Sequence, residues 1–482
     1  MTIAVETNHV CPPDRTPLPY VVVISNADRS SFIVKHNSDG KLCFPRLECP
    51  EIPVYAKRVC ECLSQRFEKM CGTRYELILL YSTINDFRND HIRPIFSNFY
   101  CLSPNDKSTG MPVAPANKQY EWMGVNEVSE LVDSMGEEKS CWINDTKDFE
   151  TFAFMMRDEV YKKGEEEFGL QPWEIPGWFT STANAATDTL AKLGYEVQGG
   201  FEQFQATHVN AAVLRANTNK GRVYLKVSNS IEGKVTNLIA SFAPQLVRKP
   251  IFVNEEKQWM LMSDQGEHVK DETRDDDFCR LLIELGKLQV QSLQHIEALK
   301  DLGLQVESSQ SLIRQTKALL ADKVVQERLA IYEEFPNHAE DGLADITLHG
   351  TALYELLREL YDSGKCPLTL THGDITENVL KADDGSLVLF DWGAARIDIA
   401  LCDTFCFDSP VTDLAMNEYL SLWENYATAS DLRKLLEIVP IHCSLVFILQ
   451  GFEGGDRMVD EDLQMLARLL VDAKEVTDKR NV

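Results

Sequence analysis

The strongest constraint on the fold is a stretch from residue 370 to residue 393, in which two short apolar runs each end in an aspartate. The first run leads to Asp374 and the second to Asp391, and Asn378 stands four positions after the first aspartate. Apolar runs of this length, separated by turn residues, predict two short neighbouring strands. The fold therefore has to deliver two carboxylates and one amide from adjacent strand ends.

These residue types fit phosphoryl transfer from ATP. That reaction needs a carboxylate to accept the proton of the attacking hydroxyl, and a carboxylate and an amide oxygen to hold Mg²⁺. Strand ends fix such side chains more rigidly than a free loop does. One aspartate alone proves nothing, but two aspartates and an asparagine in this order are the side chains that this reaction needs.

The same residues resemble the signature of the aminoglycoside phosphotransferase and choline kinase group of small-molecule kinases, which are relatives of the protein kinases. That signature is His-Gly-Asp, which ends here at Asp374, then a short gap to Asn378, and a second aspartate, Asp391, after an apolar strand. The resemblance covers roughly residues 180–482. It implies an α+β, two-lobed protein-kinase-like fold, with a small antiparallel sheet lobe and a larger helical lobe. It also implies an ATP-dependent phosphotransferase that acts on a hydroxyl group of a small molecule.

The resemblance assigns roles around the aspartates. Asp374 would be the general base, and Asp391 and Asn378 would bind Mg²⁺. We expect His372 to support the loop rather than to transfer protons. Asp403 would either brace the same loop or be an ordinary surface aspartate.

Nucleotide contacts are implied in the same way. Lys226 would contact the α- and β-phosphates of ATP, because its compact charge suits phosphate oxygens. Its acidic partner would be Glu232, the only acidic residue between Lys226 and Glu255. Met262 and Ser263 would contact the nucleotide where a strand enters the hinge between the two lobes.

The main departure from the family pattern lies between Asp374 and Asn378. The gap holds three residues where four are usual, so Thr376 or Glu377 could replace Asn378 as a metal ligand. This departure supports an alternative, a catalytically inactive kinase-fold protein that binds a nucleotide or metabolite. A third reading is a protein kinase. It is disfavoured because Gly373 stands in place of the loop arginine and no Asp-Phe-Gly to Ala-Pro-Glu segment follows the second aspartate.

The first part of the chain has the pattern of a separate α+β domain. Alternating and apolar runs predict strands over residues 20–25, 31–34 and 76–81, and a turn over residues 37–40. Apolar residues at helical spacing predict a helix over residues 54–70, and a short helix is expected after Trp122 over residues 125–132.

The order of these elements faintly resembles a Nudix domain. A Nudix box needs a glycine and a cluster of carboxylates that hold metal ions. Arg46 stands where the glycine is expected, and Glu61 and Glu68 are isolated acids seven residues apart. With so few carboxylates there is little to coordinate a metal. We therefore expect a structural or recognition domain that does not hydrolyse nucleotides, and domain boundaries of 1–150, 151–180 (a charged helical connector), 181–265 (the small lobe) and 266–482 (the helical lobe).

In the second part, a strand over residues 195–198, a turn at Gly199-Gly200 and a strand over residues 208–215 are expected, followed by a strand over residues 222–227. Further strands are expected over residues 251–253 and 259–262. Beyond Asp276 the chain is predicted to be mainly helical, over residues 278–300, 309–334, 346–362, 411–427 and 429–450.

Charge and cysteine content limit the partners. The 482 residues include 48 basic and 75 acidic side chains, a net charge of −27, which argues against binding to nucleic acid or to an anionic membrane. Residues 201–250 hold only two acids against seven bases, and this basic segment is a candidate for binding a polyanion such as a nucleotide. Residues 251–482 carry a net charge of −23 and would tolerate a cationic, amine-bearing acceptor, although solubility explains this charge equally well.

No apolar run is long enough to span a membrane and we expect no secretory signal, so we expect a cytoplasmic protein. The thirteen cysteines are scattered, and we expect reduced thiols rather than disulfides or a zinc site.

Overall fold

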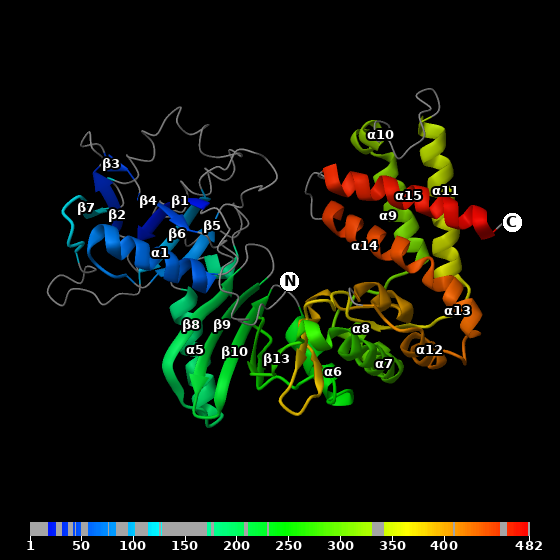
Figure 1. The fold of residues 1–482 in the computed structure, drawn as a ribbon, viewed down its shortest axis with the longest axis horizontal. Helices are drawn as coiled ribbons and strands as arrows, with labels where there is room; N and C mark the ends of the chain where they lie inside the picture. The colour runs from blue at the N-terminus through cyan, green and yellow to red at the C-terminus, as the bar shows by residue number, and fades with distance from the viewer. Residues whose placement is uncertain are drawn as a thin grey trace. The chain divides into compact units, whose positions relative to one another are not determined.

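The computed structural model describes residues 18–25, 31–36, 42–43, 45–49, 56–75, 77–82, 95–101, 114–124, 127, 171–174, 178–206, 211–228, 231–329, 342–407, 410–453 and 460–480. The chain divides into two compact units (Figure 1). One is built from Glu6–Asn229 and Ile251–Asp264, and the other mainly from Ser230–Pro250 and Gln265–Val482. We call them the sheet unit and the helical unit.

The sheet unit begins with a seven-stranded sheet and one helix, α1 (Ala56–Cys71). Val59, Leu63 and Phe67 recur at helical spacing along α1 and are fully buried. The predicted helix and the three predicted strands are confirmed, whereas the predicted turn at residues 37–40 and nearly all of the helix at 125–132 lie outside the described residues. The strand order is β3-β2-β1-β6-β5, with β4 on β1 and β7 on β2, for β1 (Leu18–Ser25), β2 (Ser31–His36), β3 (Leu42–Cys43), β4 (Arg46–Cys49), β5 (Leu77–Ser82), β6 (Ile95–Cys101) and β7 (Tyr120–Gly124).

A second sheet in the same unit is antiparallel and five-stranded. The helix α5 (Trp178–Lys192) precedes it, after a short 3₁₀ turn η2 (Pro172–Glu174), and most of the predicted connector at 151–180 lies outside the described residues. The strand order is β11-β12-β10-β9-β8, for β8 (Val197–Ala206), β9 (Ala211–Thr218), β10 (Gly221–Ser228), β11 (Phe252–Asn254) and β12 (Trp259–Ser263).

The predicted turn at Gly199-Gly200 is wrong. Both glycines lie inside β8 with φ angles of 76° and 87°, and the pairing of β8 with β9 shifts register between Gln198 and Glu202. Glycine adopts positive φ without a Cβ penalty, so a glycine pair can form a bulge within a strand as readily as a turn between strands. The first strand is therefore longer than the sequence indicated, and the segment that joins it to β9, residues 207–210, lies outside the described residues.

One side chain joins the two sheets of this unit. The amide of Gln203 in β8 accepts a hydrogen bond from the backbone nitrogen of Leu79 in β5 at 3.0 Å and donates one to the Leu79 carbonyl oxygen at 2.8 Å. Gln203 is 5% exposed. Its amide thus pairs with β5 as a neighbouring backbone would. A single hydrophobic core contains buried residues of both sheets, so the two sheets are packed as one body.

The helical unit starts with α6 (Glu232–Phe242), followed by the bulk of the helices. The long predicted helices at 278–300 and 309–334 are each interrupted, at residues 293–295 and at Asp322. The C-terminal helix α15 was not predicted. The helices after α6 are α7 (Arg274–Ser292), α8 (Ile296–Asp301), α9 (Ser309–Ala321), α10 (Lys323–Leu329), α11 (Gly342–Asp362), α12 (Asp413–Ser421), α13 (Ala429–Leu436), α14 (Val439–Glu453) and α15 (Asp460–Arg480).

Two small sheets within this unit position the motif residues. The strand β14 (Leu368–Thr371) pairs with β17 (Arg396–Ile399), and β15 (Val379–Lys381) pairs with both β16 (Leu387–Leu389) and β13 (Glu267–His268). The two apolar runs of the sequence motif are thus β14 and β16, as predicted. They lie in different sheets, however, and it is β15 and β16 that form a hairpin.

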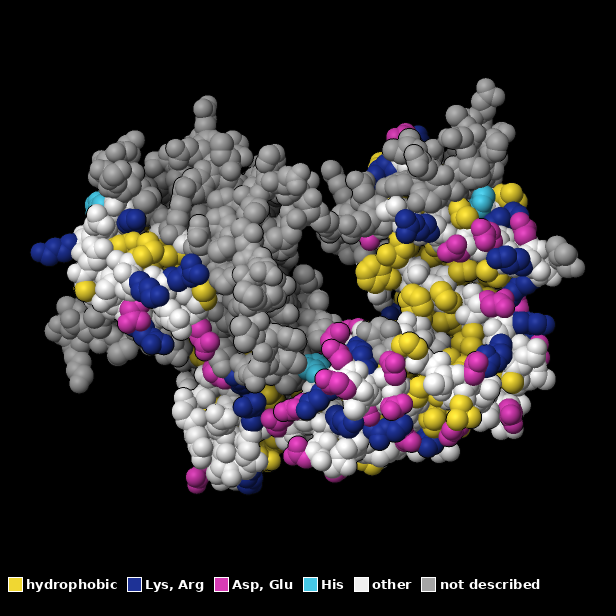
Figure 2. Space-filling view, in the orientation of Figure 1, with side chains coloured by type: hydrophobic (Ala, Val, Ile, Leu, Met, Phe, Trp, Pro, Cys, Tyr) yellow, Lys and Arg dark blue, Asp and Glu magenta, His cyan; other side chains and the backbone are white. Residues whose placement is uncertain are grey.

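The chain is therefore an α+β protein, with an antiparallel five-stranded sheet in the sheet unit and most of its helices in the helical unit. Among the helices, α9, α11, α14 and α15 pack together (Figure 1). None of the described helices is long and apolar enough to cross a membrane. Acidic and basic side chains are intermixed on the face of the helical unit that Figure 2 shows.

Candidate active site

The His-Gly-Asp segment follows β14 and is held by one buried aspartate. The backbone nitrogen of His372 donates to both carboxylate oxygens of Asp403 at 3.0 Å, and the backbone nitrogen of Gly373 donates to Oδ1 at 2.9 Å. Asp403 is 1% exposed. Of the two expectations for Asp403, the structure shows the brace and not a surface residue. Gly373 has a φ angle of 79°, and a Cβ there would lie 2.9 Å from the carbonyl oxygen of Ala394, so the turn requires glycine.

Asp403 is itself held from two helices. The Gln289 amide of α7 donates to Asp403 Oδ2 at 3.1 Å, and the hydroxyl of Tyr419 in α12 donates to Gln289 Oε1 at 2.9 Å. Burial raises the pKa of the Asp403 carboxyl, while hydrogen bonds from the amides of Gly373 and His372 oppose the rise. Sequence reasoning missed Gln289 and Tyr419, because a lone glutamine and a lone tyrosine on distant helices carry no pattern.

His372 links the two motif segments. Its Nε2 lies 2.8 Å from the carbonyl oxygen of Phe390, and its Nδ1 accepts a hydrogen bond from the backbone nitrogen of Asp374 at 3.2 Å. Nδ1 accepts, so Nε2 must carry the proton and the ring is neutral. Complete burial also lowers the pKa of His372. The ring therefore supports the loop, as expected from the sequence, and both nitrogens are occupied by backbone groups.

Asp391 follows β16 in an unusual backbone conformation. Its φ of 61° and ψ of 64° are in the left-handed region, which is uncommon for residues other than glycine. A Cβ at Gly393 would lie 3.3 Å from Asp391 Oδ1 and 3.7 Å from Glu232 Oε2. The carboxylates of Asp391 and Glu232 therefore approach the same glycine, and both side chains are at least nine-tenths buried.

Asn378 is fully buried beside the His-Gly-Asp segment. Its Nδ2 donates to the carbonyl oxygen of Asp374 at 2.6 Å, and the backbone nitrogen of Phe390 donates to the Asn378 carbonyl oxygen at 3.2 Å. Its Oδ1 is buried and accepts no hydrogen bond from any residue that the structure describes. A buried amide oxygen without a partner costs free energy unless another group satisfies it, and a hard cation can do so.

The alternatives to Asn378 are placed differently. The hydroxyl of Thr376 donates to the carbonyl oxygen of Cys406 at 2.8 Å. The side chain of Glu377 is 54% exposed and lies 4.0 Å from the guanidinium of Arg274. Of Thr376, Glu377 and Asn378, only Asn378 is buried, even with the shorter gap after Asp374.

The predicted nucleotide residues lie in the sheet unit, except for Glu232. Lys226 lies in β10 between Val213 of β9 and Met260 of β12 and is 4% exposed. In β12, Met262 is buried and Ser263 is exposed. Glu232 begins α6 in the helical unit and is 1% exposed. Its pairing with Lys226 stays a prediction, as do the nucleotide contacts of Met262 and Ser263.

Comparisons with known proteins give structures alone, since neither a protein-family model nor a curated protein matches the chain. Choline kinase LicA from Streptococcus pneumoniae is 15% identical, with a TM-score of 0.39 over 61% of this chain and 99% of that chain. Macrolide 2'-phosphotransferase MphH from Brachybacterium faecium is 17% identical, with a TM-score of 0.41 over 60% and 98%. A choline/ethanolamine kinase family protein from Mesorhizobium loti is 16% identical, with a TM-score of 0.42 over 62% and 94%.

Proposed function

We propose that this protein is an ATP-dependent phosphotransferase that acts on a hydroxyl group of a small molecule. The observation that carries the proposal is the connection between the two motif segments. Asn378 donates to the carbonyl oxygen of Asp374 and accepts from the backbone of Phe390, the residue before Asp391. One side-chain and one backbone hydrogen bond of Asn378 thus connect the segment of the proposed base with the segment that leads to Asp391, which supports the proposal.

The donor set fits Mg²⁺. Asp391 supplies a carboxylate, and Asn378 supplies a buried amide oxygen that accepts no hydrogen bond from the described residues. Mg²⁺ prefers oxygen ligands and is usually bound by a few protein oxygens together with phosphate oxygens. When bound with ATP, it neutralises charge that develops on the transferring phosphoryl group.

The other residues follow from their chemistry. Asp374 would accept the proton of the acceptor hydroxyl through its carboxylate. Lys226 would bind phosphate oxygens, with Glu232 as its acidic partner, and the hinge strand at Met262 and Ser263 would contact the nucleotide base. His372 takes no part in proton transfer, because both of its ring nitrogens are bound to backbone groups.

The acceptor is proposed only as a class. Hydroxyl-bearing small molecules fit the proposed base, and the acidic surplus after residue 250 is compatible with cationic members of that class. On the face shown in Figure 2, however, acidic and basic side chains are intermixed, which is also what solubility alone would give. Cationic and neutral hydroxyl compounds therefore both belong in a screen.

The test is a phosphorylation screen of hydroxyl-bearing metabolites with ATP and Mg²⁺, with Asp374→Asn as the blank. A positioned general base typically contributes about 10²–10⁴-fold, so turnover of any accepted compound should fall by that order. ATP affinity, measured by calorimetry, should be retained in Asp374→Asn and reduced in Lys226→Ala. If the wild type binds ATP but phosphorylates no compound and does not hydrolyse ATP, the inactive binding protein becomes the better reading.

A further inference from the structure

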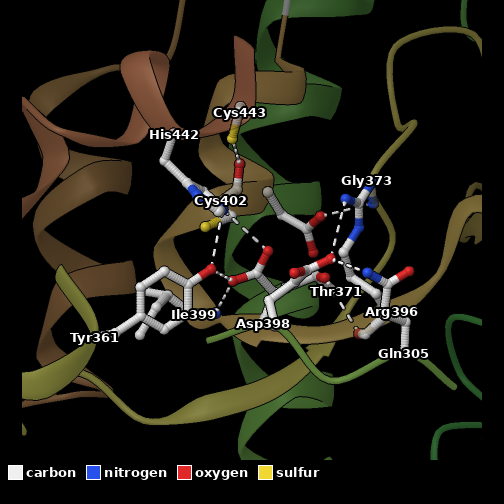
Figure 3. A network of polar contacts seen from close by, with 12 residues as sticks. Gln305, Tyr361, Thr371, Gly373, Arg396, Asp398, Ile399, Cys402, His442 and Cys443 are labelled. Atoms are coloured by element: carbon white, nitrogen blue, oxygen red, sulfur yellow. Dashed lines mark hydrogen bonds and ion pairs between the residues drawn. The ribbon is translucent and has the colours of Figure 1, made fainter. Parts of the chain in front are cut away.

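A second cluster of metal-binding side chains lies in the helical unit, apart from the oxygen ligands. It contains Cys402 of the 3₁₀ segment η5 (Ala400–Cys406) and the neighbouring His442 and Cys443 of α14. One ligand atom of each residue lies within 4.8 Å of the others. The thiol of Cys443 donates to the carbonyl oxygen of Cys402 at 3.6 Å (Figure 3). We call these three residues the thiol cluster.

The imidazole of His442 is oriented by a carboxylate. Its Nε2 lies 3.0 Å from Asp398 Oδ2 and 3.3 Å from the hydroxyl of Tyr361 (Figure 3). Asp398 also accepts hydrogen bonds from the Tyr361 hydroxyl at 2.6 Å and from the backbone nitrogen of Ile399 at 2.7 Å. The carboxylate therefore holds the proton of His442 on Nε2.

The other nitrogen of the ring has no such partner. His442 is 1% exposed, and its Nδ1 is buried without a hydrogen bond to any described residue. A buried nitrogen acceptor left in this way costs free energy. Histidine ligands of metal ions commonly donate their second ring N–H to a carboxylate, which fixes the ring and makes the other nitrogen a better ligand. Asp398 and His442 show that arrangement.

We propose that the thiol cluster binds a thiophilic metal ion such as Zn²⁺ through Cys402 Sγ, Cys443 Sγ and His442 Nδ1. Two sulfurs and an imidazole are the ligands of zinc and copper(I), not of Mg²⁺. Ligand atoms around a tetrahedral zinc lie about 3.3–3.8 Å apart. Since the two sulfurs and one ring nitrogen of His442 lie within 4.8 Å of one another, they need to approach by at most about 1.5 Å.

Burial and charge both fit a metal ion. Binding releases the proton of each thiol, and the thiolates then neutralise a divalent cation, so the filled site carries no net charge in the core. A nucleophilic Cys-His-Asp arrangement would need access for a substrate. Cys402 is only 6% exposed and Asp398 only 2%, so the cluster suits a bound ion better than a reaction with a substrate.

The site adjoins the brace of the catalytic loop. Cys402 and Asp403 are consecutive residues of η5, and Asp403 accepts the backbone hydrogen bonds of His372 and Gly373. A metal ion on Cys402 would therefore hold η5 against α14 and keep Asp403 in place. The metal site itself does not depend on the proposed phosphotransferase function.

The test is titration of the reduced, metal-free full-length protein with Co²⁺ as the probe, followed by competition with Zn²⁺. We expect a thiolate-to-cobalt charge-transfer band that saturates near one equivalent and is displaced by Zn²⁺. Cys402→Ser and Cys443→Ser should each abolish the band, whereas Cys366→Ser should retain it, because Cys366 is a buried thiol of the same hydrophobic core that lies outside the cluster. Asp398→Asn should weaken metal affinity by about 10–100-fold.

A measurement on the wild type guards against variants that fail to fold. Zn²⁺ should slow alkylation of Cys402 and Cys443, read by mass spectrometry, and leave Cys366 unchanged. The proposal is overturned if the folded wild type gives no charge-transfer band, if the band survives both cysteine substitutions, or if Zn²⁺ protects no thiol. It is also overturned if the protein isolated without reductant contains a Cys402–Cys443 disulfide that forms in preference to metal binding.

Discussion

Two regions of the helical unit are connected through η5 and offer different kinds of metal ligand. In the first region, Asp391 and Asn378 offer carboxylate and amide oxygens, which suit a hard cation that is bound together with phosphates. In the second region, the thiol cluster offers sulfur and nitrogen atoms, which suit a thiophilic ion. The consecutive residues Asp403 and Cys402 connect the regions, so each can be perturbed while the other is monitored.

The largest effect should come from Asp391→Asn, which removes the charge of the proposed metal-binding carboxylate. Turnover should fall by about 10³-fold or more, and Mg²⁺-dependent ATP affinity should fall with it. The cobalt band of the thiol cluster should stay unchanged. Steady-state kinetics and calorimetry at several Mg²⁺ concentrations measure the first two quantities, with Asp383→Asn, an exposed acid in the β15–β16 turn, as the matched control. Near-normal turnover would remove Asp391 from the proposed metal site.

A smaller loss, about 10²-fold in turnover, is expected for Asn378→Ala. The reason is that its buried Oδ1 is the proposed second oxygen ligand. Thr376→Val should cost much less, because that hydroxyl hydrogen bonds to the Cys406 carbonyl oxygen instead. Measuring turnover at several Mg²⁺ concentrations distinguishes the effects of the two variants. If Thr376→Val shifts that dependence and Asn378→Ala does not, the shortened loop presents Thr376 to the metal.

A loss of about tenfold is expected for Asp403→Asn, in turnover and not in ATP affinity. The substitution weakens charge-assisted hydrogen bonds to the amides of His372 and Gly373 but leaves the nucleotide residues intact. It should also leave cobalt binding in place, whereas Cys402→Ser should abolish cobalt binding and reduce turnover less. A loss of ATP affinity equal to the loss of turnover would contradict the positioning role.

No effect at all is expected from the N-terminal carboxylates. The isolated acids Glu61 and Glu68 lie two helical turns apart on α1, and Glu61 is exposed. The protein should release no phosphate or nucleoside monophosphate from nucleoside diphosphates in Mg²⁺ when no acceptor is present, and the Glu61→Gln, Glu68→Gln double variant should behave identically. Pyrophosphohydrolase activity that disappears in the double variant would show that the N-terminal domain is a catalytic Nudix hydrolase.

The carboxylate and amide residues of the candidate active site could be predicted because they are close together in the sequence. Asp374, Asn378 and Asp391 lie within one stretch, and short apolar strands deliver them. The role of Asp403 could be suspected from its position, but its burial depends on η5 folding beneath the loop. The thiol cluster could not be predicted, because Cys402 and Cys443 are forty-one positions apart and meet only when α14 packs on η5.

Two errors in the predicted elements arise where one sequence pattern is compatible with more than one structure. Gly199 and Gly200 indicated a turn because a glycine pair permits positive φ, and the same permission produces a bulge in a continuous strand. The helix α15 was missed because its charged residues hide the apolar positions, such as Leu463, Leu466 and Leu470, which are fully buried against neighbouring helices. In both cases the structure adopted depends on how distant residues pack together, which a single sequence does not show.

The amide of Gln203 that binds the backbone of Leu79 affects how this protein can be shortened. A version that starts just before α5 would keep every residue of the part that resembles small-molecule kinases in sequence, yet it would remove β5 and return Gln203 to water. It would also uncover β8 residues that now share a core with the N-terminal sheet. Newly exposed apolar surface of that kind favours aggregation. Tests of the proposed phosphotransferase activity should therefore retain the N-terminal sheet, even if it carries no chemistry of its own.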